Sequence, residues 1–177
     1  MRKVSIYIAL IIAMFFVVAS CKKIESPSEI PHIEFESFSI FDTIDILGNV
    51  SKGGCLKITF EDGDGDVGLE EPSYGETDTT NMFLSLLRKN GDDFIKVTDN
   101  TDPLMPSSYR IPFMRENGQS RIMKGTISLR IIYTVNSSDT IKYEVTIKDR
   151  ANNYSNSVTT CEIPLSFNGT YTFPLPE

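Results

Sequence analysis

Two neighbouring segments of this 177-residue chain alternate between apolar and polar residues with a period of two. The apolar positions of the first segment are Ile127, Leu129, Ile131, Tyr133 and Val135. Those of the second segment are Ile141, Tyr143, Val145 and Ile147. A period of two places successive side chains on opposite faces of a strand. Because residues 136–139 have turn-forming composition, the pattern predicts two half-buried antiparallel strands.

Shorter runs of the same kind occur through the rest of the chain, with turn signals between them. Residues 32–40 alternate with a one-residue shift after Phe35, which predicts a strand with a β-bulge. Leu56, Ile58 and Phe60 predict the inward face of another strand, and Asn90–Gly91 between two apolar runs predicts a hairpin. Residues 157–165 predict a last strand. No long segment has helical period, so the sequence predicts an all-β fold, an antiparallel β-sandwich.

The first 20 residues are organised as a secretory signal. Two basic residues precede an apolar run over residues 4–18, which is shorter than the roughly 20 residues that span a membrane. The run ends in Val-Ala-Ser-Cys, which resembles the lipobox of bacterial lipoproteins. The resemblance implies that Cys21 becomes the lipidated N-terminus and attaches the protein to a membrane. An uncleaved N-terminal membrane helix is the alternative.

These signals predict four parts of the chain: a signal peptide (1–20), a flexible tether (21–31), the sandwich domain (32–167) and a C-terminal tail (168–177). Removing the signal peptide takes away two of the 17 basic residues and none of the 24 acidic ones, which leaves a net charge of −9. A charge of that sign argues against nucleic acid as a partner.

A glycine-rich loop after the Leu56 strand holds three aspartates spaced two residues apart, Asp62, Asp64 and Asp66. This spacing matches the first three ligands of a calcium loop, although Val67 and Ser73 depart from the EF-hand pattern at its sixth and twelfth positions. In a sandwich, the loop after the Ile141 strand lies at the same end. Calcium ligands are therefore expected from Asp62, Asp64, Asp66, Asp149, Asn152 and Asn153. The alternative is a solvated turn whose side chains cap backbone amides.

Residues 56–69 resemble a motif of small Bacteroidetes-type lipoproteins, and residues 144–156 resemble the "Asp-x-Ala-Gly-Asn-x-Ser" ending of bacterial immunoglobulin-like domains. Asn152 replaces the usual glycine, and asparagine also tolerates the left-handed conformation. The resemblance implies an immunoglobulin-like or fibronectin type III-like sandwich on an outer-membrane lipoprotein, facing the periplasm or the cell surface. Asp-Thr-x triplets resemble the O-glycosylation acceptor of such systems at Thr43, Thr79 and Thr140.

Two cysteines remain after Cys21, namely Cys55 and Cys161. An exported compartment permits a disulfide between them. Strict alternation, however, places Cys55 on the outer face of its strand. A bridge and two separate, partly buried thiols therefore both remain open.

Support for catalysis in the sequence is weak. His32 is the single histidine and lies at the edge of the tether, which disfavours a nucleophile–histidine site and a histidine-based zinc site. The adjacent Glu70 and Glu71 are poorly suited to act as a glycosidase pair. We therefore expect a non-enzymatic binding module for a protein or glycan, in which Tyr74, Tyr109 and Tyr154 are candidate glycan platforms. The alternatives are a structural accessory lipoprotein of an outer-membrane nutrient-uptake complex and, with less support, a carboxylate-based hydrolase.

Overall fold

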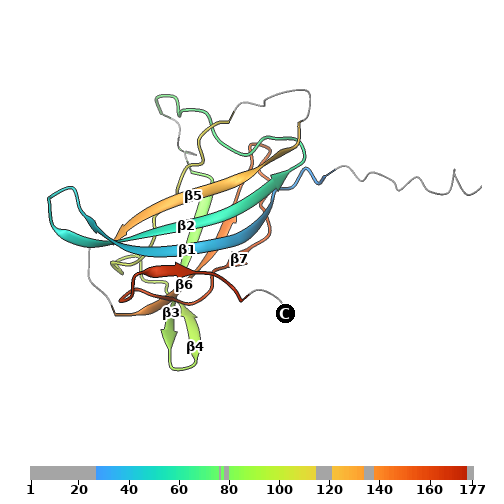
Figure 1. Cartoon of the computed structure of the whole chain (residues 1–177). Coiled ribbons are helices and arrows are strands. Elements are labelled where there is room, and N and C mark those ends of the chain that lie inside the picture. Colours follow the sequence, from blue (N-terminus) through green and yellow to red (C-terminus); the bar gives the residue numbers. More distant parts are fainter. Residues whose placement is uncertain (1–26, 76, 78–79, 115–120, 134–137, 175–177) are drawn as a thin grey trace, which may run out of the picture.

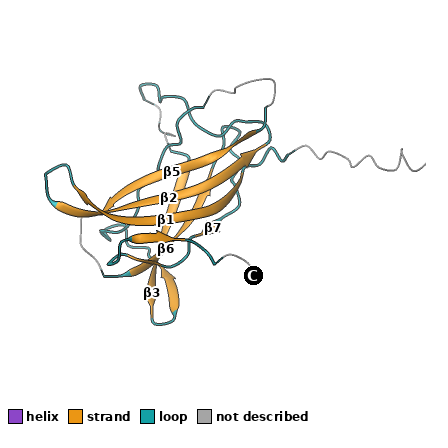
Figure 2. Cartoon of the chain, viewed as in Figure 1, coloured by secondary structure: helices purple, strands orange, loops and turns teal. Residues whose placement is uncertain are grey.

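The computed structural model describes residues 27–75, 77, 80–114, 121–133 and 138–174, and within them two antiparallel sheets pack face to face (Figure 1; Figure 2). The predicted all-β sandwich is confirmed. These residues contain no helix that is long and apolar enough to cross a membrane. The strands are β1 (His32–Ile44), β2 (Val50–Asp62), β3 (Met82–Asn90), β4 (Asp93–Lys96), β5 (Met123–Tyr133), β6 (Thr140–Ile147), β7 (Val158–Thr159), β8 (Ile163–Pro164) and β9 (Gly169–Tyr171).

The first sheet has the strand order β5-β2-β1-β9. Its central pair, β1 and β2, is a long hairpin whose register shifts between Phe35 and Ser37. This shift confirms the β-bulge predicted from the change of phase in the sequence, since one extra residue moves the following side chains to the other face. The hairpin places the start of β1 and the end of β2 at one end of the sheet, where His32 pairs with Glu61.

The second sheet has the order β4-β3-β6-β7, and β8 also pairs with β6. The predicted hairpin between β3 and β4 is confirmed, and Gly91 in its turn has a φ of 64°. The predicted strand over residues 157–165 is interrupted and forms β7 and β8. Thr160 explains the interruption, because its hydroxyl accepts a hydrogen bond from the backbone N–H of Tyr143 in place of a ladder contact.

The core lies between the two sheets and consists of the alternating inward positions that the sequence predicts. Two buried tyrosines, Tyr133 on β5 and Tyr143 on β6, share a hydrogen bond of 3.2 Å between their hydroxyls. Burial raises the pKa of Tyr133 to about 12, so both hydroxyls remain protonated and satisfy each other. The fully buried large side chains include Phe38, Ile33, Leu56, Ile58, Met82, Leu86, Ile141, Ile147 and Ile163.

The sandwich extends beyond the predicted boundary at residue 167. Strand β9 lies in the predicted C-terminal tail and pairs with β1 through Phe38, Ser39 and Ile40. After it, the ring of Phe173 packs edge-on against Phe35 at 5.3 Å. Three residues are too few to show a period in the sequence, which is why this strand was assigned to the tail.

Cys55 and Cys161 are both free, which agrees with the second of the two alternatives, two separate and partly buried thiols. Cys55 lies on β2, paired with Ser39 on one side and Arg130 on the other. Cys161 lies between β7 and β8 in the other sheet. The cysteines therefore belong to different sheets, and the outward position of Cys55 agrees with the predicted alternation.

Candidate metal centre

The aspartate loop, residues 62–69, begins where β2 ends. Gly65 and Gly68 have φ values of 73° and 103°, which side chains rarely tolerate, so the glycines allow the chain to turn sharply. One carboxylate oxygen of Asp62, Oδ2, accepts hydrogen bonds from the backbone N–H groups of Asp66 and Val67 at 2.8 and 3.2 Å. The loop is anchored further by Val67, whose side chain is fully buried.

The other carboxylate oxygen of each aspartate is buried and has no hydrogen-bond partner, namely Oδ1 of Asp62, Asp64 and Asp66. The three residues each offer one carboxylate oxygen that lies within 4.8 Å of the others. Oxygens that bind one Ca²⁺ at about 2.3–2.6 Å lie at most roughly 5 Å apart, so this spacing fits a shared calcium ion. Buried charges without a partner are strongly unfavourable, and a bound cation would offset that cost.

The electrostatics of the loop point in the same direction. Burial, together with the charges of Asp64 and Asp66, raises the pKa of the Asp62 carboxyl from 3.8 to about 6. Burial also raises the pKa of Asp66, and the nearby negative charges of Asp149 and Asp64 add to this effect. Ionisation of Asp62 and Asp66 in the metal-free loop therefore lowers the stability of the folded state.

The predicted partner loop, residues 149–156, does contact the aspartate loop. The backbone N–H of Ala151 donates to Oδ2 of Asp66 at 3.0 Å. The backbone N–H of Arg150 donates to the carbonyl oxygen of Asp66 at 3.3 Å. The guanidinium of Arg150 also donates to the carbonyl oxygen of Gly68 at 2.9 Å. The sequence-based placement of these two loops at one end of the sandwich is therefore confirmed.

The predicted ligands on the partner loop have other roles. Asp149 is buried, and its two oxygens accept hydrogen bonds from the backbone and side-chain N–H groups of Asn153 at 2.7 and 2.9 Å. Asn152 is exposed at a φ of 69°, the left-handed conformation expected there. Asp149, Asn152 and Asn153 thus build the turn that presents Ala151 to Asp66.

Sequence reasoning missed a third segment that holds the aspartate loop. The N–H of Leu69 donates to the carbonyl oxygen of Ile111 at 2.9 Å, and the guanidinium of Arg110 donates to the carbonyl oxygen of Leu69 at 2.8 Å. Residues 110–113 form no named strand, and an isolated bridge pairs Leu69 with Pro112. A segment without regular pairing has no period, so no sequence signal indicates these contacts.

Asn81 joins this third segment to the end of β6, and it was also missed. Its side chain is fully buried, accepts a hydrogen bond from the N–H of Ile111 at 2.7 Å and donates to the carbonyl oxygen of Lys148 at 3.2 Å. Its backbone bonds Tyr109 and Lys148 as well. The hydrogen bonds of Asn81 therefore take the place of strand pairing between the start of β3, the segment at 109–111 and the end of β6.

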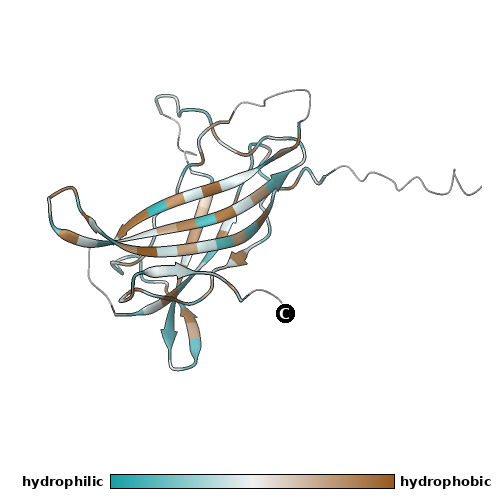
Figure 3. Cartoon of the chain, in the orientation of Figure 1, coloured by the Kyte–Doolittle hydropathy of each residue, from teal (hydrophilic) through white to brown (hydrophobic). Residues whose placement is uncertain are grey.

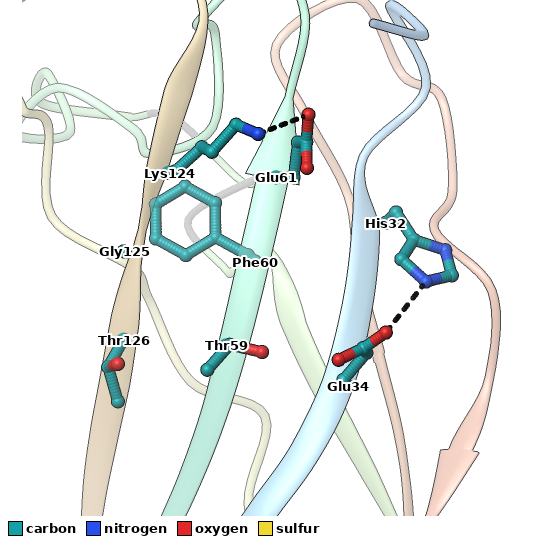
Figure 4. Close-up of a pocket in the computed structure, with 8 residues that line it drawn as sticks. All are labelled: His32, Glu34, Thr59, Phe60, Glu61, Lys124, Gly125 and Thr126. Carbon is teal, nitrogen blue, oxygen red and sulfur yellow. Dashed lines mark ion pairs between the residues drawn. The ribbon is translucent and has the colours of Figure 1, made fainter.

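A shallow groove on the first sheet also contains candidate catalytic groups (Figure 4). Lys124 forms an ion pair with Glu61 at 2.7 Å, and the imidazole of His32 lies 3.7 Å from the Glu34 carboxylate. The groove is lined by His32, Glu34, Thr59, Phe60, Glu61, Lys124, Gly125 and Thr126. Exposed, mutually neutralised pairs are poorly suited to acid–base chemistry.

The three tyrosines that are candidate glycan platforms differ in how far they are exposed to solvent. Tyr74 is fully exposed, and Tyr154 is 59% exposed with its ring against Phe83 at 6.1 Å. Tyr109 is partly buried and packs against the core. Glu70 and Glu71 are exposed side by side.

The candidate modification sites lie partly within the described residues. Thr43 and Thr140 are half-buried positions of paired strands, opposite Ser51 and Pro164. Thr79, Cys21 and the predicted signal peptide lie outside the described residues.

No protein-family model, curated protein or solved structure matches this chain. The interpretation of the metal centre therefore depends on the residues and geometry described above.

Proposed function

We propose that this protein is a lipid-anchored, non-enzymatic interaction module of the cell envelope, whose sandwich is stabilised by one Ca²⁺. The observation that carries the proposal is the cluster of three buried carboxylate oxygens without partners on Asp62, Asp64 and Asp66. These oxygens are shielded from solvent, so a bound ion is enclosed by protein. An enclosed ion stabilises structure and is poorly placed to activate water or a substrate.

The strand order supports an immunoglobulin-like or fibronectin type III-like sandwich. With β1, β2 and β5 taken as strands A, B and E, the first sheet has the order E-B-A followed by the additional strand β9. With β3, β4, β6 and β7 taken as C, C′, F and G, the second sheet has the order C′-C-F-G. Domains of this architecture carry many functions, most of them in recognition, so the fold agrees with an interaction module without specifying a partner.

The anchor is proposed at Cys21, at the outer membrane facing the periplasm or the cell surface. Membrane fractions and intact mass test it in a Gram-negative bacterium with its own lipoprotein-processing pathway. The expected wild-type product lacks residues 1–20, carries a lipid on Cys21 and sediments with membranes, and Cys21→Ser is expected to lose the lipid. A Cys21→Ser variant that retains the added lipid mass would contradict the anchor.

An exposed apolar turn favours a protein as the partner. A protein partner also agrees with the alternative role, an accessory subunit of an envelope complex. The turn between β1 and β2 is held by the Asp45 carboxylate, which accepts hydrogen bonds from the N–H groups of Leu47 and Asn49, both at 2.8 Å. It nevertheless presents aliphatic side chains to solvent, and hydrophobic residues colour the projecting end of the hairpin brown (Figure 3). We call this set the hairpin tip: Ile44, Ile46, Leu47 and Val50, which are 65%, 98%, 81% and 78% exposed.

A preordered apolar tip reduces the entropy cost of docking into an apolar pocket. The Asp45 pKa is lowered by the hydrogen bonds of Asn49, so a carboxylate remains ionised in the turn and disfavours insertion into lipid. We expect a photocrosslinker at Ile46 to give one defined protein adduct in native membranes, whereas the same group at Tyr74 does not. Equal adducts at both positions, or none at Ile46, would count against the tip as a contact surface.

Replacing the tip residues provides a matched stability test. The double substitution Ile46→Ser and Leu47→Ser is expected to change the free energy of unfolding by less than about 0.5 kcal/mol, because exposed side chains have little burial to lose. The same variant is expected to lose the crosslinked partner. A large loss of stability would mean that the tip packs within this chain.

A further inference from the structure

The chain immediately before β1 lies directly against the aspartate loop. We call residues 27–31 the entry segment. The N–H of Gly63 donates to the carbonyl oxygen of Ser28 at 2.8 Å. A Cβ atom on Gly63 would lie 2.4 Å from the carbonyl oxygen of Pro27 and 2.5 Å from that of Ser28, so the two backbones touch. Only glycine permits this contact, and Gly63 lies between the candidate ligands Asp62 and Asp64.

The start of β1 is also tied to the partner loop. The side chain of Asn156 accepts a hydrogen bond from the N–H of Ile33 at 2.8 Å and donates to its carbonyl oxygen at 2.9 Å. The partner loop in turn reaches the cluster through the bond from Ala151 to Asp66. Three segments far apart in the sequence therefore meet around the candidate ion: the entry segment with the start of β1, the aspartate loop and the partner loop.

We propose that calcium in the aspartate loop controls whether the entry segment is attached to the sandwich. The inference depends on the proposed metal site and adds a consequence to it. Without the ion, the unpaired carboxylates on both sides of Gly63 repel each other, and the loop relieves that repulsion by opening. Gly63 moves with its neighbours, which removes its hydrogen bond to Ser28. With the ion bound, the loop closes and holds the entry segment.

Attachment changes the free length of chain between the proposed anchor and the domain. From Cys21 to Ser28 the chain reaches at most about 25 Å, whereas from Cys21 to His32 it reaches at most about 40 Å. Calcium therefore shortens the reach of the domain from the membrane. Attachment also orients the sandwich so that the end with the aspartate loop faces the proposed anchor.

Linkage makes the coupling reciprocal: if calcium favours attachment, attachment must favour calcium by the same factor. Gly63→Ala tests this, because its methyl group displaces the entry segment and leaves all three carboxylates in place. Gly169→Ala is the matched control, since its added Cβ makes only ordinary contacts of 3.7 Å with Tyr171. We expect Gly63→Ala to weaken calcium binding by about tenfold or more in calorimetry, and Gly169→Ala to leave it unchanged.

Hydrogen exchange of the wild-type mature chain tests the same coupling without any variant. Calcium is expected to slow exchange of the Gly63 amide, and of peptides covering residues 27–34, by about tenfold or more relative to chelator. If wild type binds calcium but exchange at these amides is unchanged, or if Gly63→Ala binds calcium as tightly as wild type, the coupling is wrong and the metal site remains. If wild type binds no calcium, the metal site itself is wrong.

Discussion

Calcium is expected to raise the midpoint of thermal unfolding of the mature protein by roughly 5–10 °C over its value in chelator. An ion that binds only the folded state at a concentration of about 100 times its dissociation constant adds about 2.7 kcal/mol of stability. For a chain of this size, each kcal/mol corresponds to roughly 2–4 °C. The ion also offsets the burial of the Asp62 carboxylate and its repulsion by Asp64 and Asp66, which together raise the Asp62 pKa in the metal-free loop.

The double substitution Asp64→Asn and Asp66→Asn separates a metal site from a capping turn. In calcium the variant is expected to unfold below wild type, because two ligands lose their charge. In chelator it is expected to unfold at or above wild type, because two of the repelling charges are gone. Asp92→Asn, an exposed position in the β3–β4 turn, is the charge-matched control and should keep the full calcium shift. A calcium shift that is the same in both variants would rule out the cluster as its source.

Asn81→Ala is expected to lower the free energy of unfolding by about 2–4 kcal/mol, since it leaves buried backbone groups of Ile111 and Lys148 without the partners that Asn81 provides. Denaturant unfolding measures the loss. The substitution also loosens the segment that bonds Leu69 behind the aspartate loop, so calcium affinity should fall with stability.

Asn168→Ala is the matched control for this prediction. The Asn168 side chain also makes two hydrogen bonds, to Lys52 and Asp42, but it is exposed to water. Its loss is expected to cost less than about 0.5 kcal/mol. Equal losses of unfolding free energy in the two variants would show that the burial of Asn81 does not increase its contribution to stability.

The strands could be predicted because a half-buried strand records its two faces in the sequence. Alternation indicated β5 and β6, and the change of phase near Phe35 indicated the bulge in β1. Strand β9 was missed because its three residues show no period, and Thr160 interrupts the last predicted strand by a side-chain bond that alternation does not detect. In each case, a local hydrogen bond or a short strand pairing stands where a longer, regular strand pairing is expected.

The candidate site could be predicted in part for similar reasons. The spacing of Asp62, Asp64 and Asp66 and the order of the strands placed the two loops together. The spacing did not indicate that Asp149 and Asn153 bond each other within their own turn. Asn81, Arg110 and the contact of Gly63 with the entry segment gave no signal, since contacts between irregular segments follow no period or motif.

The most direct test of the metal centre is calorimetric titration of metal-free mature protein with calcium at pH 7.5. One ion per wild-type chain is expected, and none in a folded variant with Asp62, Asp64 and Asp66 all replaced by asparagine. Circular dichroism establishes that the variant is folded. The absence of binding to wild type, or undiminished binding to the triple variant, would contradict the assignment of these three aspartates as a calcium site.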